Sequence, residues 1–434
     1  MKNIIFISLL VLSISCKKED EKIVTPIKTI IINDVSPSSG VKNTLVLLTG
    51  SGFSEVLANN TVILNGKTCL VIEGTASELI VSIPPSAGSG KFNISAEGAT
   101  GTSPNFEFLY TYTVSNFAGN GTVGSTNGQG PNASFNSPFG MDTDAEGNIY
   151  VCDAVSQKIR KIDPNGMVST FSGSGTAGNS DGAASVAQFN YPSFISVDNA
   201  GIAYVTDEHS VKKITPNGTV STIAGSQEYG FVDNALGAEA RFSLPAGVAN
   251  DGSGNLFIAD YESHRIRKII SLGLVSTSAG SGVSGFINGS LLEATFNHPL
   301  SLAFDGSGNL YVGDYANFSV RKISPQGLVS TYAGNGQFGD LDGQGIEAQF
   351  NGVLGMTFDA IGNLYLVDAG NRKIKKVTPN GTVSTVAGNG SIGDVIGNGN
   401  QAEFTSLYGI AIDADGNLYV SDRGTLKIKK ITID

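Results

Sequence analysis

The sequence predicts an all-β protein, in which a β-sandwich is followed by a six-bladed β-propeller closed by a strand from the N-terminal side of the array. Three observations support this fold class. Between residues 27 and 113, short alternating segments are separated by Gly, Pro and Asn-Gly turns. After residue 114, a unit of about 54 residues recurs six times. The composition, with 56 glycines and no tryptophan among 434 residues, is that of a turn-rich β protein.

Residues 1–15 have the features of a signal peptide and are excluded from the fold. Lys2 precedes an apolar run at residues 4–14, which is shorter than the roughly 20 residues that span a bilayer. A small residue then precedes Cys16, and the whole segment resembles a bacterial lipoprotein signal, which implies that Cys16 is lipidated. Residues 16–26 contain "KKEDEK" and resemble the charged tether of lipoproteins on the outer surface of Gram-negative bacteria. We therefore expect a lipid anchor in the outer membrane that faces the cell exterior; ordinary secretion is the alternative.

The region 27–113 contains strand-like segments at regular short spacing, which is typical of a β-sandwich. Its stretches "VSPSSG", "LTGSGF", "VILNG", "LIVSIPPSAGSG" and "FEFLYTY" resemble, in this order, an IPT/TIG domain, which is an immunoglobulin-like module. The resemblance implies a domain that binds a partner or acts as a spacer. None of these motifs offers acid–base chemistry.

The region 114–434 is the repeat array. Each unit contains an Ala-x-Phe motif, a strand such as "GVAND", a Gly turn, and strands such as "LYVGD", "VRKIS" and "VSTxAG", which predicts a four-stranded antiparallel meander. Six meanders around one axis form a propeller. The segments "GNLYVGDYANFSVRKI", "GNLYLVDAGNRKIKKV" and "GNLFIADYESHRIRKI" resemble NHL repeats. The motif phenylalanines, which we interpret as anchors of the inter-blade loops, are Phe135, Phe189, Phe242, Phe296, Phe350 and Phe404.

One strand of the array stands apart from the others. The motif "VSTxAG" follows the first three strands in five units, but the last unit ends at "KIKKITID" without it. A looser copy, "VSNFAG", begins at Val114, before the first unit. We therefore expect residues 114–118 to pair with residues 427–433, so that both ends of the array build one blade and no open edge remains.

The most regular polar residue is an aspartate that ends the second strand of every unit. A ligand site usually breaks the symmetry of a repeat, so we interpret these side chains as structural acceptors of N–H groups in the turn that follows. They are Asp153, Asp207, Asp260, Asp314, Asp368 and Asp422. The adjacent Lys and Arg residues of the third strands are expected to keep their charged heads in water. A polyanion-binding groove is the alternative for these cations.

Lactonases and metal-dependent lyases exist on related six-bladed folds, and their sites draw ligands from around the central channel. Apart from the carboxylates of the hairpin turns, the innermost strands contain one acid, Asp142, and no His or Glu. His209, His264 and His298 fall on loops of one face, with His298 before a first strand and the others after second strands, so we expect different distances from the axis. They form the alternative metal triad. We expect no metal and no other cofactor.

The long loop after "VSTxAG" differs from unit to unit and carries most candidate ligand-binding residues. Aromatic rings beside carboxylates and amides suit a sugar ring or a protein surface. The alternative is that these rings pack down their own loops. The candidates, which include two tyrosines from turns after second strands, are Tyr229, Phe231, Tyr261, Phe286, Tyr315, Phe338 and Asp340.

Together these features favour a non-catalytic surface protein whose propeller face captures a glycan or protein ligand, with the IPT/TIG-like domain as a stalk or second contact. A metal-dependent hydrolase or lyase is the main alternative, and a purely structural envelope protein is the third. The formal net charge of −11 argues against nucleic acid as a partner, because that role needs a concentrated cationic face. Contact with the membrane is expected only through the lipid anchor.

Overall fold

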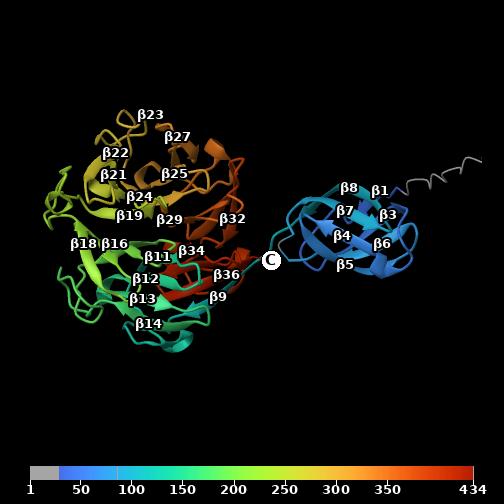
Figure 1. The fold of residues 1–434 in the computed structure, drawn as a ribbon, viewed down its shortest axis with the longest axis horizontal. Coiled ribbons are helices and arrows are strands. Elements are labelled where there is room, and N and C mark those ends of the chain that lie inside the picture. Colours follow the sequence, from blue (N-terminus) through green and yellow to red (C-terminus); the bar gives the residue numbers. More distant parts are fainter. Residues whose placement is uncertain (1–28, 86, 434) are drawn as a thin grey trace, which may run out of the picture. The chain divides into compact units, whose positions relative to one another are not determined.

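The computed structural model describes residues 29–433 with the exception of residue 86, so the signal segment and Cys16 lie outside the described residues. The chain divides into two compact units, Met1–Leu109 and Tyr110–Asp434. Both units consist of β-strands with a few short 3-10 helices (Figure 1). Within the described part of the chain, no helix is long and apolar enough to cross a membrane.

The first unit is an immunoglobulin-like sandwich of eight strands in the order β1-β3-β6-β5-β4-β7-β8-β2. Strand β5 joins the two layers, because its beginning, 67–69, pairs with β4 whereas its remainder, 70–74, pairs with β6. Strands β1 and β8 also lie against each other, so the sheet is nearly closed. The elements are β1 Ile31–Ser36, β2 Ser39–Gly40, β3 Leu45–Ser51, η1 Leu57–Asn59, β4 Asn60–Leu64, β5 Lys67–Gly74, β6 Glu78–Ser82, β7 Gly90–Ala96 and β8 Ala99–Phe108.

The second unit is a six-bladed propeller, as predicted (Figure 1). Every blade has four long antiparallel strands, and four blades add a fifth strand of two residues that the sequence did not predict. Blades one to three contain β10 Gly128–Gln129, β11 Pro138–Thr143, β12 Ile149–Asp153, β13 Lys158–Ile162 and β14 Met167–Ser172; β15 Pro192–Val197, β16 Ala203–Asp207, β17 Ser210–Ile214 and β18 Val220–Ala224; and β19 Pro245–Asn250, β20 Leu256–Asp260, β21 Arg265–Ile269 and β22 Val275–Ala279.

The remaining blades repeat this arrangement. In the first five blades the long strand with the lowest number lies next to the axis. In the last blade the innermost strand is β34, and β9 lies on the outer side. Blades four to six contain β23 Gly289–Ser290, β24 Pro299–Phe304, β25 Leu310–Asp314, β26 Ser319–Ile323 and β27 Leu328–Ala333; β28 Gly343–Gln344, β29 Val353–Phe358, β30 Leu364–Asp368, β31 Lys373–Val377 and β32 Thr382–Ala387; and β33 Gly397–Asn398, β9 Tyr112–Ala118, β34 Leu407–Ile412, β35 Leu418–Asp422 and β36 Lys427–Ile433. The short 3-10 helices are η2 Gly130–Asn132, η3 Ala154–Ser156, η4 Gly237–Glu239, η5 Tyr261–Ser263, η6 Tyr315–Asn317, η7 Gly345–Glu347 and η8 Gly399–Gln401.

The predicted closure of the ring is confirmed. Strand β9 pairs antiparallel with β36, from Ala118 opposite Ile428 to Tyr112 opposite Ile433. Its inward residues become part of the last blade, because Val114 and Ala118 are each 1% exposed. Figure 1 shows the two strands side by side although more than 300 residues separate them in the sequence.

The repeated aspartates are fully buried, but their backbone donors are not those that the sequence predicted. Each carboxylate accepts an N–H from a residue directly after the Ala-x-Phe motif of its own blade, for example Asn136 on Asp153 and Asn297 on Asp314, both at 2.7 Å. The motif phenylalanines are also fully buried. The aspartate therefore takes its backbone N–H bond from the incoming inter-blade loop rather than from the turn that follows it.

The expectation that the third-strand cations keep their heads in water is wrong for one residue in each blade. These residues are 0% exposed, because the inter-blade loop folds over them and supplies acceptors; Arg160 donates to the carbonyls of Ser134 and Thr126. In three blades the guanidinium also pairs with the repeated aspartate, as in Arg321–Asp314 at 2.8 Å. The six buried cations are Arg160, Lys212, Arg267, Arg321, Lys375 and Lys429.

Candidate functional site: an aromatic bowl above the central channel

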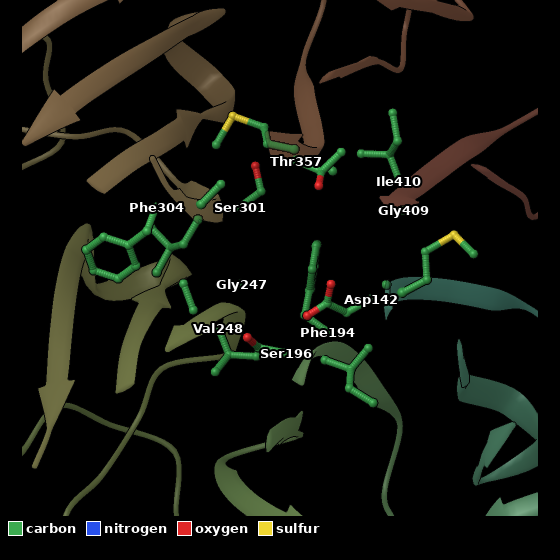
Figure 2. Close-up of a pocket in the computed structure, with 18 of the residues that line it drawn as sticks. Asp142, Phe194, Ser196, Gly247, Val248, Ser301, Phe304, Thr357, Gly409 and Ile410 are labelled. Carbon is green, nitrogen blue, oxygen red and sulfur yellow. The ribbon is translucent and has the colours of Figure 1, made fainter. Parts of the chain in front are cut away.

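Two cavities follow one another along the innermost strands of the propeller. The central channel, about 260 Å³, is lined by the middle of these strands, and Figure 2 shows Asp142, Ser196 and Phe304 around it. A second cavity of about 380 Å³ lies where the same strands begin. We call this second cavity the aromatic bowl. Its lining residues are Phe139, Tyr191, Ser193, Phe194, Glu208, Leu244, Pro245, Ala246, Tyr261, Leu300, Tyr315, Leu354 and Tyr408.

The one acid of the channel, Asp142, joins two blades. Its carboxylate accepts the backbone N–H of Thr143 at 2.9 Å and that of Val197, from the next blade, at 2.8 Å. Burial raises the pKa of Asp142 to about 6. A neighbouring hydroxyl has a similar role, since Thr143 donates to the carbonyl of Ile412 across the seam between the first and last blades. The polar groups of the channel thus mainly hold adjacent blades together.

The floor of the bowl is narrow because four blades have glycine at one position of the innermost strand. A Cβ at Gly409 would lie 2.5 Å from the carbonyl oxygen of Phe139, and a Cβ at Gly247 would lie 2.6 Å from that of Leu300. The second blade has Phe194 at this position, which lines the channel (Figure 2) and also the bowl. Phe194 therefore separates the bowl from the channel.

The walls of the bowl are aromatic rings in contact with one another. Phe139 packs on Tyr408 with ring centroids 4.1 Å apart and on the edge of Tyr191 at 5.5 Å. Tyr191 adopts a left-handed backbone conformation, with φ of 66°, directly before strand β15. Tyr261 and Tyr315 follow the repeated aspartates of two successive blades, and their centroids lie 6.4 Å apart.

The four tyrosine hydroxyls of the bowl have no hydrogen-bond partner among the described residues. Burial, and next the neighbouring phenol of Tyr191, raise the pKa of Tyr408 far above its usual range. Tyrosines at the other end of the blades differ, because Tyr150, Tyr311 and Tyr419 each donate to a carboxylate of a hairpin turn at 3.0–3.2 Å. The bowl thus combines an apolar wall with unpartnered donors and acceptors, which is the usual composition of a ligand pocket.

The structure divides the predicted ligand-binding residues into two groups. Tyr261 and Tyr315 line the bowl. The remaining five lie on the inter-blade loops, away from the bowl lining. Phe231 and Phe286 cover buried cations of their own blades, with ring centroids 4.6 and 4.8 Å from the guanidinium carbons of Arg267 and Arg321.

The other loop candidates also have local partners. Phe338, 64% exposed, contacts the edge of Phe318. Asp340 forms ion pairs with Lys373 and Lys375. Tyr229 is 59% exposed and packs against the His209 ring.

Two of the three histidines lie together, so the expectation that strand position separates His264 from His298 is wrong. The backbone N–H of His298 donates to Nδ1 of His264 at 3.1 Å, and Nε2 of His298 lies 3.6 Å from a carboxylate oxygen of Glu262. Burial, and next the charge of His298, lower the pKa of His264. His209 belongs to a different blade. In the described part of the chain, no group of three His, Cys, Asp or Glu side chains is placed to hold a metal.

Sequence reasoning missed most of the bowl. Phe139, Phe194 and Tyr408 lie at the start of innermost strands, which we had considered only as sources of acids and histidines. A signal was present, because the second residue of these strands is aromatic in two of six blades, where the others have Ser, Ala or Leu, and Phe194 stands at the next position, where four blades have Gly. Such a break in the symmetry of a repeat is what a ligand site requires.

The fold and the site define a two-domain all-β protein, in which an immunoglobulin-like domain precedes a six-bladed propeller with a ligand-sized aromatic bowl. Residues 31–112 match the family described as "IPT/TIG domain", and residues 242–269 match "NHL repeat". In sequence the chain is 31% identical over 326 residues to "NHL repeat-containing protein 2" of Bos taurus, which covers 66% of this chain. The chain spans only 45% of the length of that relative.

Solved structures share the arrangement over nearly the whole chain. A protein of unknown function from Bacteroides thetaiotaomicron has a TM-score of 0.65 at 20% identity, covering 94% of this chain and 99% of its own. A structure titled "auxiliary nutrient binding protein", from the same organism, has a TM-score of 0.57 at 17% identity, covering 94% of this chain and 98% of its own. At these identities the likeness shows a common fold.

Proposed function

We propose that this protein captures a glycan in the aromatic bowl and performs no chemistry on it. The observation that carries the proposal is the set of four tyrosine hydroxyls in a concave aromatic wall, from Tyr191, Tyr261, Tyr315 and Tyr408, for which no described residue is a hydrogen-bond partner. A sugar ring has an apolar C–H face and a rim of hydroxyls, so it can cover the rings and satisfy the phenols at once. A flat protein surface would reach a hollow of this kind less well.

Two further observations support capture rather than turnover. The bowl lining contains a single carboxylate, Glu208, and no histidine, so it lacks a pair of groups for acid–base chemistry. A protein of this fold is titled "auxiliary nutrient binding protein", which supports a binding role for the propeller. The immunoglobulin-like domain then acts as a stalk or as a second contact.

The test is a glycan array probed with residues 27–434, followed by calorimetry of the strongest ligand with point variants. Tyr408→Phe removes one bowl hydroxyl and should weaken binding about 5- to 10-fold, because a hydrogen bond contributes about 1 kcal/mol. Tyr191→Ala removes a wall and should weaken it further. The matched control is Tyr150→Phe, whose hydroxyl binds Asp144 at the opposite end of the blade. Undiminished affinity in both bowl variants would refute the proposal.

We also propose that the protein is attached to the outer membrane through a lipid on Cys16, with the propeller facing the cell exterior. The support is the amino-acid sequence of residues 1–26 alone, because these residues lie outside the described part of the chain. Cys16→Ala should move the protein from the membrane to the soluble fraction and abolish incorporation of labelled lipid. Membrane association that persists in this variant, with labelling absent from both proteins, would contradict the anchor.

A further inference from the structure

Glu208 is the only charged residue in the bowl lining of the described chain. It lies in the short turn between β16 and β17, with a left-handed φ of 48°. One carboxylate oxygen, Oε2, accepts a hydrogen bond from the side-chain amide of Asn190. The other oxygen, Oε1, has no hydrogen-bond partner, and the carboxylate forms no ion pair with any described residue. The wall of the bowl therefore presents a negative charge without a counter-charge.

The cations nearest to Glu208 in the chain and around the bowl have other partners. Lys212 donates to Asp181, to Thr222 and to a backbone carbonyl. The Arg423 guanidinium donates to the hydroxyl of Ser137 and lies over the ring of Phe139, outside the bowl lining. The adjacent His209 ring packs against Tyr229.

Aromatic rings line the same cavity as this carboxylate, and they too favour a positive ligand. A cation gains energy over the face of Tyr or Phe, and the gain grows where water is excluded. A neutral ligand would instead cover Oε1 of Glu208 without giving it a strong partner, which costs free energy. The charge of Glu208 and the aromatic rings therefore both favour a cationic ligand over a neutral one.

We infer that the ligand of the bowl is an amino sugar whose protonated amine pairs with Glu208. This inference rests on the proposed function, because the sugar ring and its hydroxyls account for the aromatic wall and the four phenols. The ammonium group accounts for Glu208. A lysine side chain would satisfy the carboxylate as well, but it would leave most of the tyrosine hydroxyls without partners.

The test compares three β-1,4-linked tetrasaccharides that differ only at C2 of each ring: glucosamine, N-acetylglucosamine and glucose. Titration calorimetry at pH 6.5 should give at least about ten-fold tighter binding of the glucosamine tetramer than of the other two, because a hydrogen bond to a charged group contributes about 1.5–3 kcal/mol. Glu208→Gln should abolish this preference, because the glucosamine tetramer then loses its charged partner.

The control for overall charge is Glu146→Gln, which removes the same charge from an exposed hairpin turn at the other end of strand β11. Its preference for the glucosamine tetramer should equal that of the unmodified protein. A second measurement needs no variant. Raising the pH from 6.5 to 9 deprotonates an amine of ordinary pKa near 8, and it should abolish the preference.

Three results would overturn the inference. The first is equal binding of the amine and hydroxyl tetramers, and the second is binding of none of the three. The third is a tetralysine peptide that binds as tightly and with the same dependence on Glu208, which would show that the amine alone is recognised. Proposed glycan capture is judged separately, by Tyr408→Phe and Tyr191→Ala on the ligand that the array identifies.

Discussion

At the scale of residues, the buried cation of each blade determines how well the repeated aspartate is satisfied. Arg267 reaches both Asp260, at 2.9 Å, and a carboxylate of the inter-blade loop, because a guanidinium presents several donors in a fixed fork. A lysine side chain presents all its donors from a single ammonium nitrogen. Lys212 donates to two loop acceptors and to Thr222 of strand β18, and Oδ2 of Asp207 is buried without a partner among the described residues.

The turn after Asp207 does not supply the missing donor to the Asp207 carboxylate either. In the fourth and fifth blades the third residue after the aspartate donates to its carboxylate, as Asn317 does to Asp314 at 2.7 Å. The second blade has a two-residue turn, Glu208 and His209, and Ser210 donates instead to the backbone carbonyl of Asp207. Burial consequently raises the pKa of Asp207 to about 7.

Asp207 should make the stability of the propeller depend on pH. Because its folded pKa is raised above the ordinary value near 3.9, its contribution is fully present below about pH 4 and is lost as the pH rises through 7. Asp207→Asn removes this dependence. Relative to the unmodified protein, the variant should gain about 2–3 kcal/mol of unfolding free energy between pH 5 and pH 8. Urea unfolding at both pH values measures this difference.

The control is Asp314→Asn, which leaves the buried Arg321 without its counter-charge. It should lose about 3–5 kcal/mol, the usual cost of breaking a buried pair. This loss should change less between pH 5 and pH 8 than the effect of Asp207→Asn, because the pKa of Asp314 is raised only to about 6. Parallel pH profiles for Asp207→Asn and the unmodified protein would show that Asp207 is ionised normally in the fold.

At the scale of elements, four of the innermost strands approach a neighbouring strand so closely at one position that a Cβ there would clash with it. Gly140, Gly247, Gly355 and Gly409 occupy this position in four blades. The approach brings the aromatic residues that precede these glycines, such as Phe139 and Tyr408, into contact across the seam between blades. The glycines thus permit the close strand approach that brings these large rings into contact.

Gly409→Ala should destabilise the propeller by about 1–3 kcal/mol, because its Cβ would lie 2.5 Å from the carbonyl oxygen of Phe139. It should also weaken ligand binding by displacing Phe139 and Tyr408. Gly306→Ala is the matched control, since a Cβ there meets nothing within 4 Å, and its stability should change by less than about 0.5 kcal/mol. Thermal unfolding measures the pair, and equal melting temperatures would contradict the packing argument.

The same elements show what the sequence could predict. The period of the array gave the six blades and their strands because every unit repeats the same turns and apolar alternation, as at Phe296 and Phe350. The burial of one Lys or Arg side chain in each third strand was not predicted. The sequence of a third strand suggests exposure to water, whereas an inter-blade loop that is distant in the sequence covers it. The bowl was missed because its members, such as Tyr191 and Tyr408, come from all six blades, which only ring closure brings together.

At the scale of the whole molecule, the propeller depends on strand β9 for closure. This strand covers β36, buries Val114 and Ala118, and places Phe117 against Tyr419 with ring centroids 4.9 Å apart. Just before it, Tyr110 lies under the ammonium group of Lys376 at 4.6 Å from the ring centroid. The ring therefore includes residues on both sides of the start of the array.

A protein truncated to begin at Leu109 should fold cooperatively without the immunoglobulin-like domain. A protein that begins at Asn120 lacks β9, and it should aggregate or melt at a clearly lower temperature, because the edge of β36 is left without backbone partners. Calorimetry and size-exclusion chromatography of the two truncated proteins measure this difference. If both are equally soluble and equally stable, closure by β9 does not stabilise the ring.

The closure strand also has a mechanical consequence. Strand β9 is the first part of the ring that the chain reaches after the immunoglobulin-like domain, so any tension transmitted from the N-terminal side enters the propeller there. The hydrogen bonds between β9 and its neighbours β36 and β33 share that load before it reaches the other five blades. A pull on a captured ligand would thus strain the closing blade first, and this blade sets the force that the ring withstands.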